Sequence, residues 1–465
     1  MNTGPYTVKG RRPVLSDGIA ERQCAKRAQI AIKARKEPKT RFDNLLHHLT
    51  YELVEECLNN IPLTSAPGVD GMSVAQAREN LSWLLPPMLQ QIHQGEYQAP
   101  AVRRVYIPKA TRGMRPLGVP EVIDRAIQAA TVKILNEIYE QDFLRYSFGF
   151  RPKLGCHHAL ATVSAVTKGA KMYHAFEVDI RDFFGSITHE WMMKFLGHRI
   201  SDKRVLKLVE AWLKAGVMEQ GRWRATEQGT PQGGSVSPLL ANIYLHYVLD
   251  LWWDKKINPK LRDPLRYAHL VRYADDFIIF FRNPNDAKSI KPLLQARLNQ
   301  FGLKIAEEKS CLTDLTPNRP NKRNGSETKR RVIKFLGLTM GISNKRAGGP
   351  GTRIWYRTDN RRFTRAKARM KETLRRIMHW SEEDQAERIN AIVRGHSNYY
   401  GLPGNSSRIR TFRDETIRYW RRCLSRRSQK GHLTWKGINQ LLERHPVTKA
   451  NLKLTYADLP AFTRL

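Results

Sequence analysis

The sequence predicts an α+β fold followed by a helical domain, and three observations support this. Two apolar runs of β type, at 176–184 and 272–281, lie within a stretch from 174 to 282 where strand and helix patterns alternate. Beyond residue 352 the apolar residues recur at helical spacing and the chain becomes strongly basic. With 465 residues the chain is too long for one compact core, so roughly two to four domains are expected.

The first part of the chain reads as a basic extension followed by regular elements. Residues 1–45 are rich in Ala, Lys and Arg, and 43–61 has the apolar spacing of a helix. A turn is predicted at 65–71, where proline and glycine break the pattern, and a strand at 102–108. A helix should open after Pro120, because four isoleucines then fall on one face: Ile123, Ile127, Ile134 and Ile138.

The last third of the chain predicts a sheet segment and then helices. A polar, charged segment at 316–331 is expected to be exposed, and 332–342 to form a strand or hairpin. The glycine-rich segment 344–351 is interpreted as a hinge between domains. Three helices should follow: one with Phe363, Met370, Leu374 and Ile377 on one face, a second opened by Ser381, and a third with Ile417, Trp420 and Leu424.

The strongest bulk signal is charge, with a formal net charge of +37 and a pI near 10.3. Because basic clusters recur along the chain, we expect an extended track for a polyanion, with an affinity that falls steeply as salt rises. No apolar run is long enough to span a membrane, so no membrane partner is expected. Five cysteines without a CxxC pair favour a reducing compartment, and we expect a cytoplasmic protein associated with nucleic acid.

Aspartates stand at the ends of the two β-type runs. Asp179 ends the apolar part of the first run, and Asp275 and Asp276 lie just before the apolar part of the second. Two such loops side by side on a sheet would bring the carboxylates to one point, where like charges are costly unless a cation neutralises them. Carboxylate ligands of this kind indicate Mg²⁺. Paired metal ions held by carboxylates catalyse in-line phosphoryl transfer, so the expected chemistry is nucleotide polymerisation.

Other segments fit the same chemistry. Lys109 and Arg115 lie on either side of a glycine-containing turn and suit the binding of a triphosphate. Gln232 lies in the segment PQGG before a predicted helix, where glycines allow the backbone to approach a base pair closely. Lys309 follows an alternating strand pattern and is a candidate donor to the leaving pyrophosphate.

The order of these motifs resembles the reverse-transcriptase domain over residues 45–342, and most closely that of group II intron reverse transcriptases/maturases. SAPGVDG, RPLGVPEVIDRAIQ, SFGFRP, the Asp179 segment, GTPQGGSVSPLLANIYL, YADDF and KFLG occur in family order. The segments IVRGHSNYYG (392–401) and RYWRRCLSRRSQKG (418–431) are similar to the family's maturase, or thumb/X, domain. Together these segments cover most of the chain.

The resemblance implies a right-hand polymerase, with fingers and palm built on an antiparallel sheet flanked by helices and then an α-helical thumb. It implies these boundaries: a basic N-terminal extension at 1–45, fingers with part of the palm at 46–175, the palm at 176–343, the thumb/maturase domain at 352–440 and a short C-terminal tail at 441–465.

The resemblance also implies roles for single residues. The carboxylates Asp179, Asp275 and Asp276 match the family's ligands for two Mg²⁺ ions, with Asp276 supporting the first ion from beside the site. Phe184 matches the aromatic gate that excludes a ribose 2′-OH. At Gly185 many relatives carry an aspartate that is not a metal ligand. Lys109 and Arg115 match triphosphate contacts from the fingers. Gln232 matches the contact near the nascent base pair, and Lys309 matches a lysine late in the domain.

Nucleic-acid contacts are expected in the predicted thumb. Tyr399 and Tyr400 either stack on RNA bases or pack in the core of a helical bundle. The expected partners are an RNA template and intron RNA, a DNA primer or target DNA, and dNTPs, whereas the oligomeric state stays open. The arginines read as phosphate contacts are Arg361, Arg365, Arg369, Arg421, Arg422 and Arg426.

The expected activity is RNA-templated DNA synthesis by a protein that also binds group II intron RNA and assists its splicing and mobility. Two alternatives remain: a splicing-only RNA-binding maturase, and a free-standing reverse transcriptase recruited for defence, repair or diversification. Residues 433–465 are too few for the HNH-type endonuclease of some relatives, so cleavage of target DNA is not expected. Asp182 should be a solvated or helix-start residue. Cys156, His157 and His158 should form a helix start and pack in the core rather than bind a metal.

Overall fold

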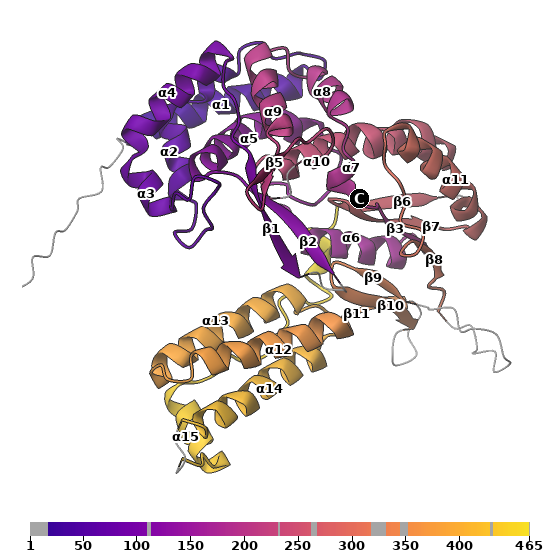
Figure 1. The fold of residues 1–465 in the computed structure, drawn as a ribbon. Helices are drawn as coiled ribbons and strands as arrows, with labels where there is room; N and C mark the ends of the chain where they lie inside the picture. Colours follow the sequence, from indigo (N-terminus) through magenta and orange to yellow (C-terminus); the bar gives the residue numbers. More distant parts are fainter. Residues whose placement is uncertain are drawn as a thin grey trace, which may run out of the picture. The chain divides into compact units, whose positions relative to one another are not determined.

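The computed structural model describes residues 17–108, 113–230, 233–261, 267–317, 332–344, 352–427 and 431–464. The chain forms two compact units. The first unit takes in Met1–Ile107, Arg115–Phe143 and Phe184–Tyr244, and the second Pro108–Met114, Leu144–Phe183 and Leu245–Leu465. Figure 1 labels their helices and strands.

The first unit is mostly helical. Its centre is α5 (Val122–Asp142), whose four isoleucines predicted to share a face are all buried, and which packs against α1 (Asp17–Lys36) and α2 (Tyr51–Asn59). The helix predicted after Pro120 is therefore confirmed. The other helices are η1 (Leu46–His48), α3 (Val74–Glu79), α4 (Leu81–Gln94), α8 (His189–Gly197), α9 (Lys203–Lys214) and α10 (Ser237–Leu245), with the short α7 (Phe183–Ser186) at the boundary between units.

A small sheet accompanies these helices, with strand order β2-β1-β4-β5. Strand β1 (Val102–Pro108) confirms the strand predicted at 102–108, and β2 (Met114–Val119) is its neighbour. On the other side β1 pairs in parallel with β4 (Val217–Glu219), which pairs antiparallel with β5 (Arg222–Arg224). This small sheet is thus mixed.

The second unit is built on an antiparallel sheet of order β6-β7-β3-β8. Its strands are β6 (Ala268–Tyr273), β7 (Asp276–Phe281), β3 (His174–Asp179) and β8 (Cys311–Asp314). Residues 277–281 of β7 are all buried, so both faces of this strand are covered. Helices α6 (Cys156–Lys168) and α11 (Pro284–Gln300) pack against the sheet, as the predicted palm requires.

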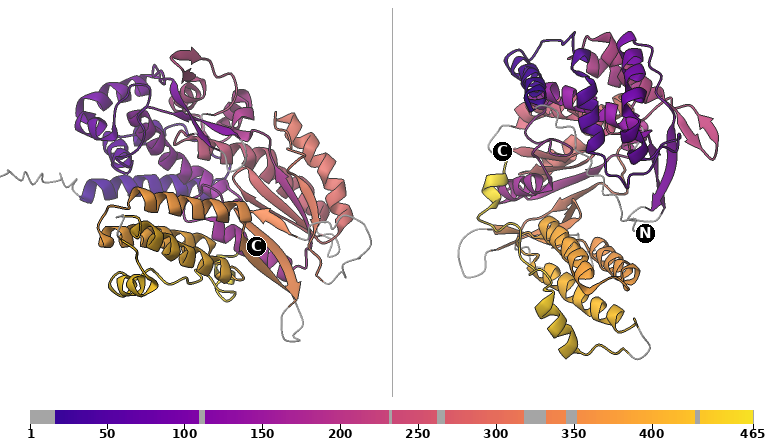
Figure 2. Two further views of the ribbon diagram at one scale, coloured as in Figure 1. Left: turned by 60° about the horizontal axis from the view of Figure 1, so that its bottom comes forward. Right: turned by 90° about the vertical axis from the view of Figure 1, so that its left-hand side faces the viewer.

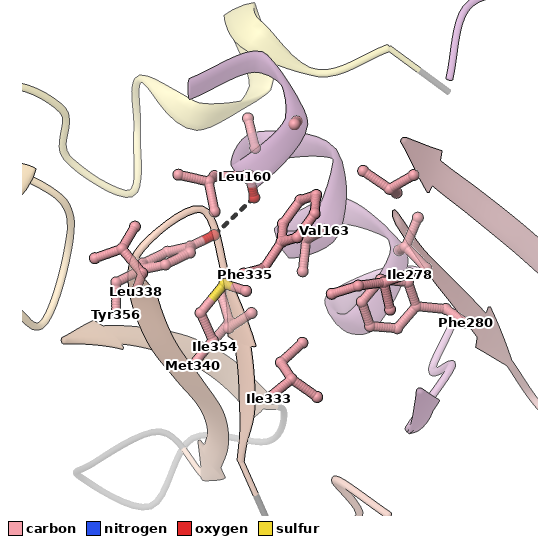
Figure 3. Packing of buried hydrophobic residues seen from close by; sticks show 14 of the residues in the cluster. Leu160, Val163, Ile278, Phe280, Ile333, Phe335, Leu338, Met340, Ile354 and Tyr356 are labelled. Carbon is pink, nitrogen blue, oxygen red and sulfur yellow. Dashed lines mark hydrogen bonds between the residues drawn. The ribbon is translucent and has the colours of Figure 1, made fainter. Parts of the chain in front are cut away.

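A second sheet, of order β11-β10-β9, follows in the chain. Strands β9 (Ile333–Phe335) and β10 (Leu338–Asn344) form the hairpin predicted at 332–342. The interpretation of 344–351 as a hinge between domains is wrong, because β10 pairs along its whole length with β11 (Thr352–Thr358) on the other side of that segment. Figure 3 shows β7, β9, β10, β11 and α6 packed around one core, where Tyr356 Oη donates a hydrogen bond to Leu160 O (2.8 Å).

The chain then forms a bundle of α12 (Asn360–Arg376), α13 (Glu382–Tyr400), α14 (Ser406–Leu424) and α15 (Trp435–Arg444), visible in Figures 1 and 2. All the apolar residues predicted to line its helices are buried in one core, and the Ser381 side chain caps α13 as predicted. The remaining short helices are the π-helices η2 (His246–Asp250) and η3 (Trp253–Ile257) and the 3-10 helices η4 (Asn258–Leu261) and η5 (Leu459–Phe462). In the part of the chain that is described, no helix is long and apolar enough to cross a membrane.

Candidate active site

The two aspartate segments meet on adjacent strands of the second unit. The pairing of β3 with β7 places Asp179 directly opposite Asp276, and Asp275 lies in the preceding turn. Side chains at paired positions of an antiparallel sheet lie about 5 Å apart at Cβ. The predicted convergence of the two segments is therefore confirmed, whereas the role of the three carboxylates as metal ligands stays a prediction.

A buried ion pair fixes the turn that carries Asp275. The Arg272 guanidinium, which is fully buried, binds the equally buried Asp250 carboxylate through two contacts of 2.8 Å and 2.5 Å. Its Nη1 also donates to Ala274 O (3.1 Å) in a turn where Ala274 has a positive φ of 56°. Gly149 lies so close behind the turn that a Cβ would be 2.4 Å from Ala274 N. These residues position the turn, and the sequence analysis did not single them out.

The backbone of Asp179 is held by the segment that precedes β8. Its N–H donates to Ser310 Oγ (3.1 Å), and its carbonyl accepts from Ala306 N (2.8 Å). Lys309 Nζ lies 3.2 Å from Asp179 Oδ2, and most of the Lys309 side chain is exposed. The structure thus brings together two residues that were predicted separately, a carboxylate and the late lysine.

The carboxylate cluster holds more negative charge than its surroundings neutralise. The Asp276 side chain keeps solvent access, yet its partly desolvated position and the negative charges of Asp275, Asp179 and Glu177 together raise its pKa to about 7. Arg362 lowers this pKa only in part. A bound cation would relieve the repulsion.

The donor set suits Mg²⁺ in particular. Within the described ranges, no group of three or more His, Cys, Asp or Glu side chains is arranged to hold a metal ion on its own. Mg²⁺ in polymerase-type sites is bound through one or two carboxylates together with waters and substrate phosphates. An aspartate pair opposite each other on two strands, open to solvent, fits that requirement.

Glu177 is a further acid that the sequence analysis missed. It lies two residues before Asp179 and so on the same face of β3. Its carboxylate accepts hydrogen bonds from Lys334 N (2.8 Å) in β9 and from Thr313 Oγ1 (3.2 Å) and Cys311 Sγ (3.3 Å) in β8. Burial raises the pKa of Glu177. The sequence FEVD could have revealed Glu177, because alternate residues of a strand share one face and Glu177 therefore lies beside Asp179.

The KFLG segment forms a strained turn that the helical bundle holds. Leu336 and Gly337 have positive φ values of 50° and 77°. Asp359 N donates to Gly337 O (3.1 Å), and Tyr399 Oη donates to Leu336 O (3.0 Å). Tyr400 packs edge-on against Tyr399, with ring centroids 4.7 Å apart. Of the two alternatives left open for these tyrosines, the structure shows packing and a hydrogen bond to the turn, while stacking on RNA stays a prediction.

Besides Lys309, two predicted substrate contacts, Phe184 and Arg115, lie among the described residues. Phe184 is half-buried in α7, and its carbonyl accepts from Thr230 N (2.9 Å). Arg115 is exposed on β2. Lys109 and Gln232 lie outside the described residues. Beside the segment that contains Gln232, the Gln128 side chain faces Gly234 and Val236, so this glutamine supports the loop and was also missed.

The arginines predicted as phosphate contacts fall into two groups. Most are exposed on α12 or at the end of α14: Arg361, Arg369, Arg422 and Arg426. Arg365 is half-exposed. Arg421 differs, because its Nη1 donates to Leu433 O (2.9 Å) and its guanidinium lies 4.8 Å from the Trp435 ring centroid. Arg421 therefore ties α14 to α15.

Asp182 and the residues at the start of α6 lie at helix starts, as predicted. Asp182 is exposed directly before α7, as predicted for a helix-start residue. Cys156 begins α6 as predicted, and His158 Nδ1 accepts from Gly155 N (3.1 Å) at that helix start. His157 Nε2 lies 3.1 Å from Tyr399 O.

Comparison with known proteins adds independent findings. Residues 107–340 match the family model "Reverse transcriptase (RNA-dependent DNA polymerase)", and residues 363–440 match "Group II intron, maturase-specific domain". Protein YkfC of Escherichia coli is 34% identical, over 55% of this chain and 74% of YkfC. The group II intron-encoded protein LtrA of Lactococcus lactis is 30% identical, over 70% of this chain and 64% of LtrA. The 91 kDa protein in the cob intron of Schizosaccharomyces pombe is 26% identical, over 74% of this chain and 48% of that protein. The chain thus spans less than two thirds of the length of the latter two relatives.

Proposed function

The chain belongs to the group II intron reverse transcriptase/maturase family, and from this premise we propose that it is an RNA-directed DNA polymerase that binds intron RNA and assists its splicing and mobility. The observation that carries the polymerase activity is the register of β3 with β7, which sets Asp179 opposite Asp276 beside Asp275. The proposed place of action is the bacterial cytoplasm, on nucleic acid.

Asp179, Asp275 and Asp276 would hold the Mg²⁺ ions, two in number as in other polymerases of this kind. When bound, Mg²⁺ supplies charge neutralisation and lowers the pKa of the primer 3′-OH. The rest of the catalytic effect comes from positioning by the protein. The Arg272–Asp250 pair and the Glu177 hydrogen bonds serve this purpose, because they fix the turn and the strand that carry the carboxylates.

Substrate selection is assigned to side chains other than the three aspartates. Lys309 balances Asp179 in the absence of substrate, and its exposed ammonium is free to reach a phosphate oxygen when a triphosphate enters. Phe184 would exclude a ribose 2′-OH by its bulk. Arg115, and with it Lys109 and Gln232, would contact the triphosphate and the nascent base pair.

The helical bundle would bind nucleic acid. It carries exposed arginines on α12 and α14, which suit phosphates of an RNA or of a template–primer duplex. We assign residues 46–175 to fingers with part of the palm and 176–343, together with the paired strand β11 (Thr352–Thr358), to the palm. The rest of 352–440 is assigned to the thumb/maturase domain, with 1–45 as a basic extension and 441–465 as a tail.

Primer extension tests the polymerase activity. The purified chain is given a DNA primer annealed to an RNA template, dNTPs and Mg²⁺, and product length is read on a denaturing gel. We expect processive DNA synthesis that a chelator abolishes and that Mg²⁺ restores. Strong RNA binding without any extension would support the splicing-only maturase instead.

Sequencing the RNA that co-purifies from the native host at moderate salt tests the intron association. One dominant, highly structured transcript containing this reading frame is expected. A broad mixture without such an RNA would point to a free-standing reverse transcriptase used in defence, repair or diversification.

A further inference from the structure

The outer face of the β9-β10-β11 sheet carries an aromatic ring and a cation away from the core. In β11 the residues Ile354, Tyr356 and Thr358 are buried, so Trp355 and Arg357 between them face the other side. Cross-strand pairing sets Trp355 opposite Gly341 in β10. None of the residues assigned above to substrate or phosphate contacts lies on this face of β11.

The Trp355 ring lies directly over Gly341. A Cβ at Gly341 would be 2.6 Å from Trp355 Cζ2, so only glycine allows the ring to rest on β10 at this point. The Trp355 side chain is half-exposed. One part of the ring is thus supported by the sheet, while the remainder is accessible as a platform.

The start of α14 closes this platform into a groove. The groove has a volume of about 290 Å³ and is lined by Trp355, Arg357, Gly404, Ser407 and Arg408. Side chains of one strand and of one helix start, about 50 positions apart in the sequence, therefore face a common space. Its size suits a single nucleotide rather than a folded partner.

Two guanidiniums meet in this groove without a carboxylate. Burial lowers the pKa of Arg408, and the positive charge of Arg357 lowers it further. Among the described residues, neither arginine forms an ion pair with an acid; Arg408 instead donates to Asn360 Oδ1 and lies 4.7 Å from the Phe363 ring centroid. Two like charges held together in this way are stabilised when an anion binds between them.

The first turn of α14 adds to the attraction for an anion. Asn405 precedes this helix but does not cap it, because its Oδ1 accepts from Thr358 N (2.9 Å) and its amide donates to Thr358 Oγ1 and Tyr400 O (each 2.8 Å). The leading N–H groups of the helix are consequently left without a side-chain acceptor beside the two arginines.

We propose that this groove binds one nucleotide of an unpaired nucleic-acid strand, with its phosphate between Arg357, Arg408 and the first turn of α14 and its base on Trp355. A guanidinium pair beside an aromatic ring has the chemistry by which single-stranded segments are held. The inference rests on the proposed function only for the class of ligand, since it requires neither polymerisation nor the carboxylate site.

Fluorescence anisotropy with labelled ten-nucleotide oligo-U RNA and oligo-dT DNA tests the proposal, each compared with a duplex of the same length. We expect Arg357→Ala/Arg408→Ala to weaken single-strand binding about tenfold and to reduce the salt slope by roughly 0.7, the contribution on single strands of the one phosphate held between the two arginines. Duplex binding should change less than twofold. The RNA and DNA arms report whether the 2′-OH matters.

Arg410→Ala is the matched control, because Arg410 is exposed on the same helix two positions away and does not line the groove. An equal loss of affinity in this variant would overturn the proposal and leave only general charge. Arg357→Lys/Arg408→Lys guards against misfolding: it retains the charge and should keep the salt slope while losing part of the affinity.

Photocrosslinking gives a readout independent of affinity. An oligo-U carrying one 5-bromouridine should crosslink to the peptide that contains Trp355, and mass spectrometry identifies the site. Crosslinks that map elsewhere, with unchanged affinity of the double alanine variant, would contradict the proposal. Primer extension is measured on the same preparations. Loss of extension with single-strand binding intact would count against the proposed function alone, and loss of single-strand binding specificity with extension intact would count against the groove alone.

Discussion

The palm-like sheet and the helical bundle of the second unit carry their charges in opposite ways. In the sheet, acids stand on strands whose apolar residues are buried on both faces, and the basic partner Arg272 is buried with Asp250. In the bundle, arginines such as Arg361 and Arg422 are exposed on helices whose apolar faces form a separate core. The sheet fixes charged atoms in place, whereas the bundle presents charged side chains to solvent.

This difference follows from what each part must do. Catalytic carboxylates have to hold their geometry within a fraction of an ångström, which requires buried hydrogen bonds around them. Phosphates of a nucleic acid can be attracted by long, solvated side chains without a fixed geometry.

Removing one member of the buried pair should have the largest effect. Arg272→Ala leaves Asp250 charged and buried, and we expect a loss of about 3–5 kcal/mol in the free energy of unfolding of the second unit, measured by urea titration. Arg422→Ala, on the exposed bundle surface, should change it by less than about 0.5 kcal/mol.

The double variant Arg272→Met/Asp250→Leu sharpens this test. Replacing a buried ion pair by apolar side chains of similar volume is often neutral, so most of the stability should return. A loss of less than about 1 kcal/mol for Arg272→Ala alone would remove the contrast between sheet and bundle.

A buried histidine of the bundle, His396, predicts a pH effect. Burial lowers the pKa of His396 to about 4, and its ring stacks on Phe412 with centroids 3.9 Å apart. The unfolded chain binds a proton at this residue below about pH 6.5 while the folded chain does not. The stabilisation is thus complete above that pH and is lost as pH falls toward 4, by about 2 kcal/mol at pH 5.

Thermal unfolding of the chain at pH 7.5 and pH 5.0 measures this effect. His396→Phe keeps an aromatic ring against Phe412 and should flatten the pH dependence. The exposed His379 serves as control, because His379→Gln should leave the pH dependence unchanged. If both variants flatten the pH dependence equally, burial of His396 is not the cause of the pH dependence.

A smaller change is expected from the aromatic gate. Phe184→Val shortens a half-buried ring at the proposed gate position, and the ratio of ribonucleotide to deoxynucleotide incorporation should rise about tenfold, equivalent to about 1.4 kcal/mol of discrimination. The neighbouring Phe183 is only 2% exposed, so Phe183→Val should lower stability instead. An unchanged incorporation ratio in Phe184→Val would remove its proposed role.

The smallest effect separates two adjacent arginines of α14. Arg422→Ala should reduce the salt slope of RNA binding by about 0.7–0.9, the contribution of a single phosphate contact. Arg421→Ala should leave the slope unchanged and lower the melting temperature, because Arg421 is held by Leu433 O and Trp435. The reverse pattern would show that burial in the bundle does not predict which cations meet phosphate.

Local pattern and ordered motifs predicted much of this molecule. The helix after Pro120, the strand at 102–108 and the buried faces of the bundle all follow from apolar periodicity, which reports burial directly. The meeting of Asp179 with Asp275 and Asp276 was predicted because the first strand pattern ends in an acid and the second begins with two.

What was missed depends on contacts between distant parts of the chain. Glu177 accepts a hydrogen bond from Lys334, 157 positions away, and no local pattern reports such a partner. The glycine-rich segment at 344–351 has the composition of a linker, and only the pairing of β10 with β11 shows that it joins two strands of one sheet. Strand β4 has three residues, too few to show a period.

The most direct test of the central claim compares Asp275→Asn with Asp182→Asn in primer extension and in RNA binding. Asp275 stands at the carboxylate corner, while Asp182 is exposed nearby with a positive φ that asparagine tolerates well. We expect Asp275→Asn to lose extension by about a thousandfold or more while RNA affinity stays within twofold, since phosphoryl transfer depends on charge neutralisation at that site. Asp182→Asn should behave as the unaltered chain. Extension by Asp275→Asn within tenfold of the unaltered chain would contradict the assignment of the site.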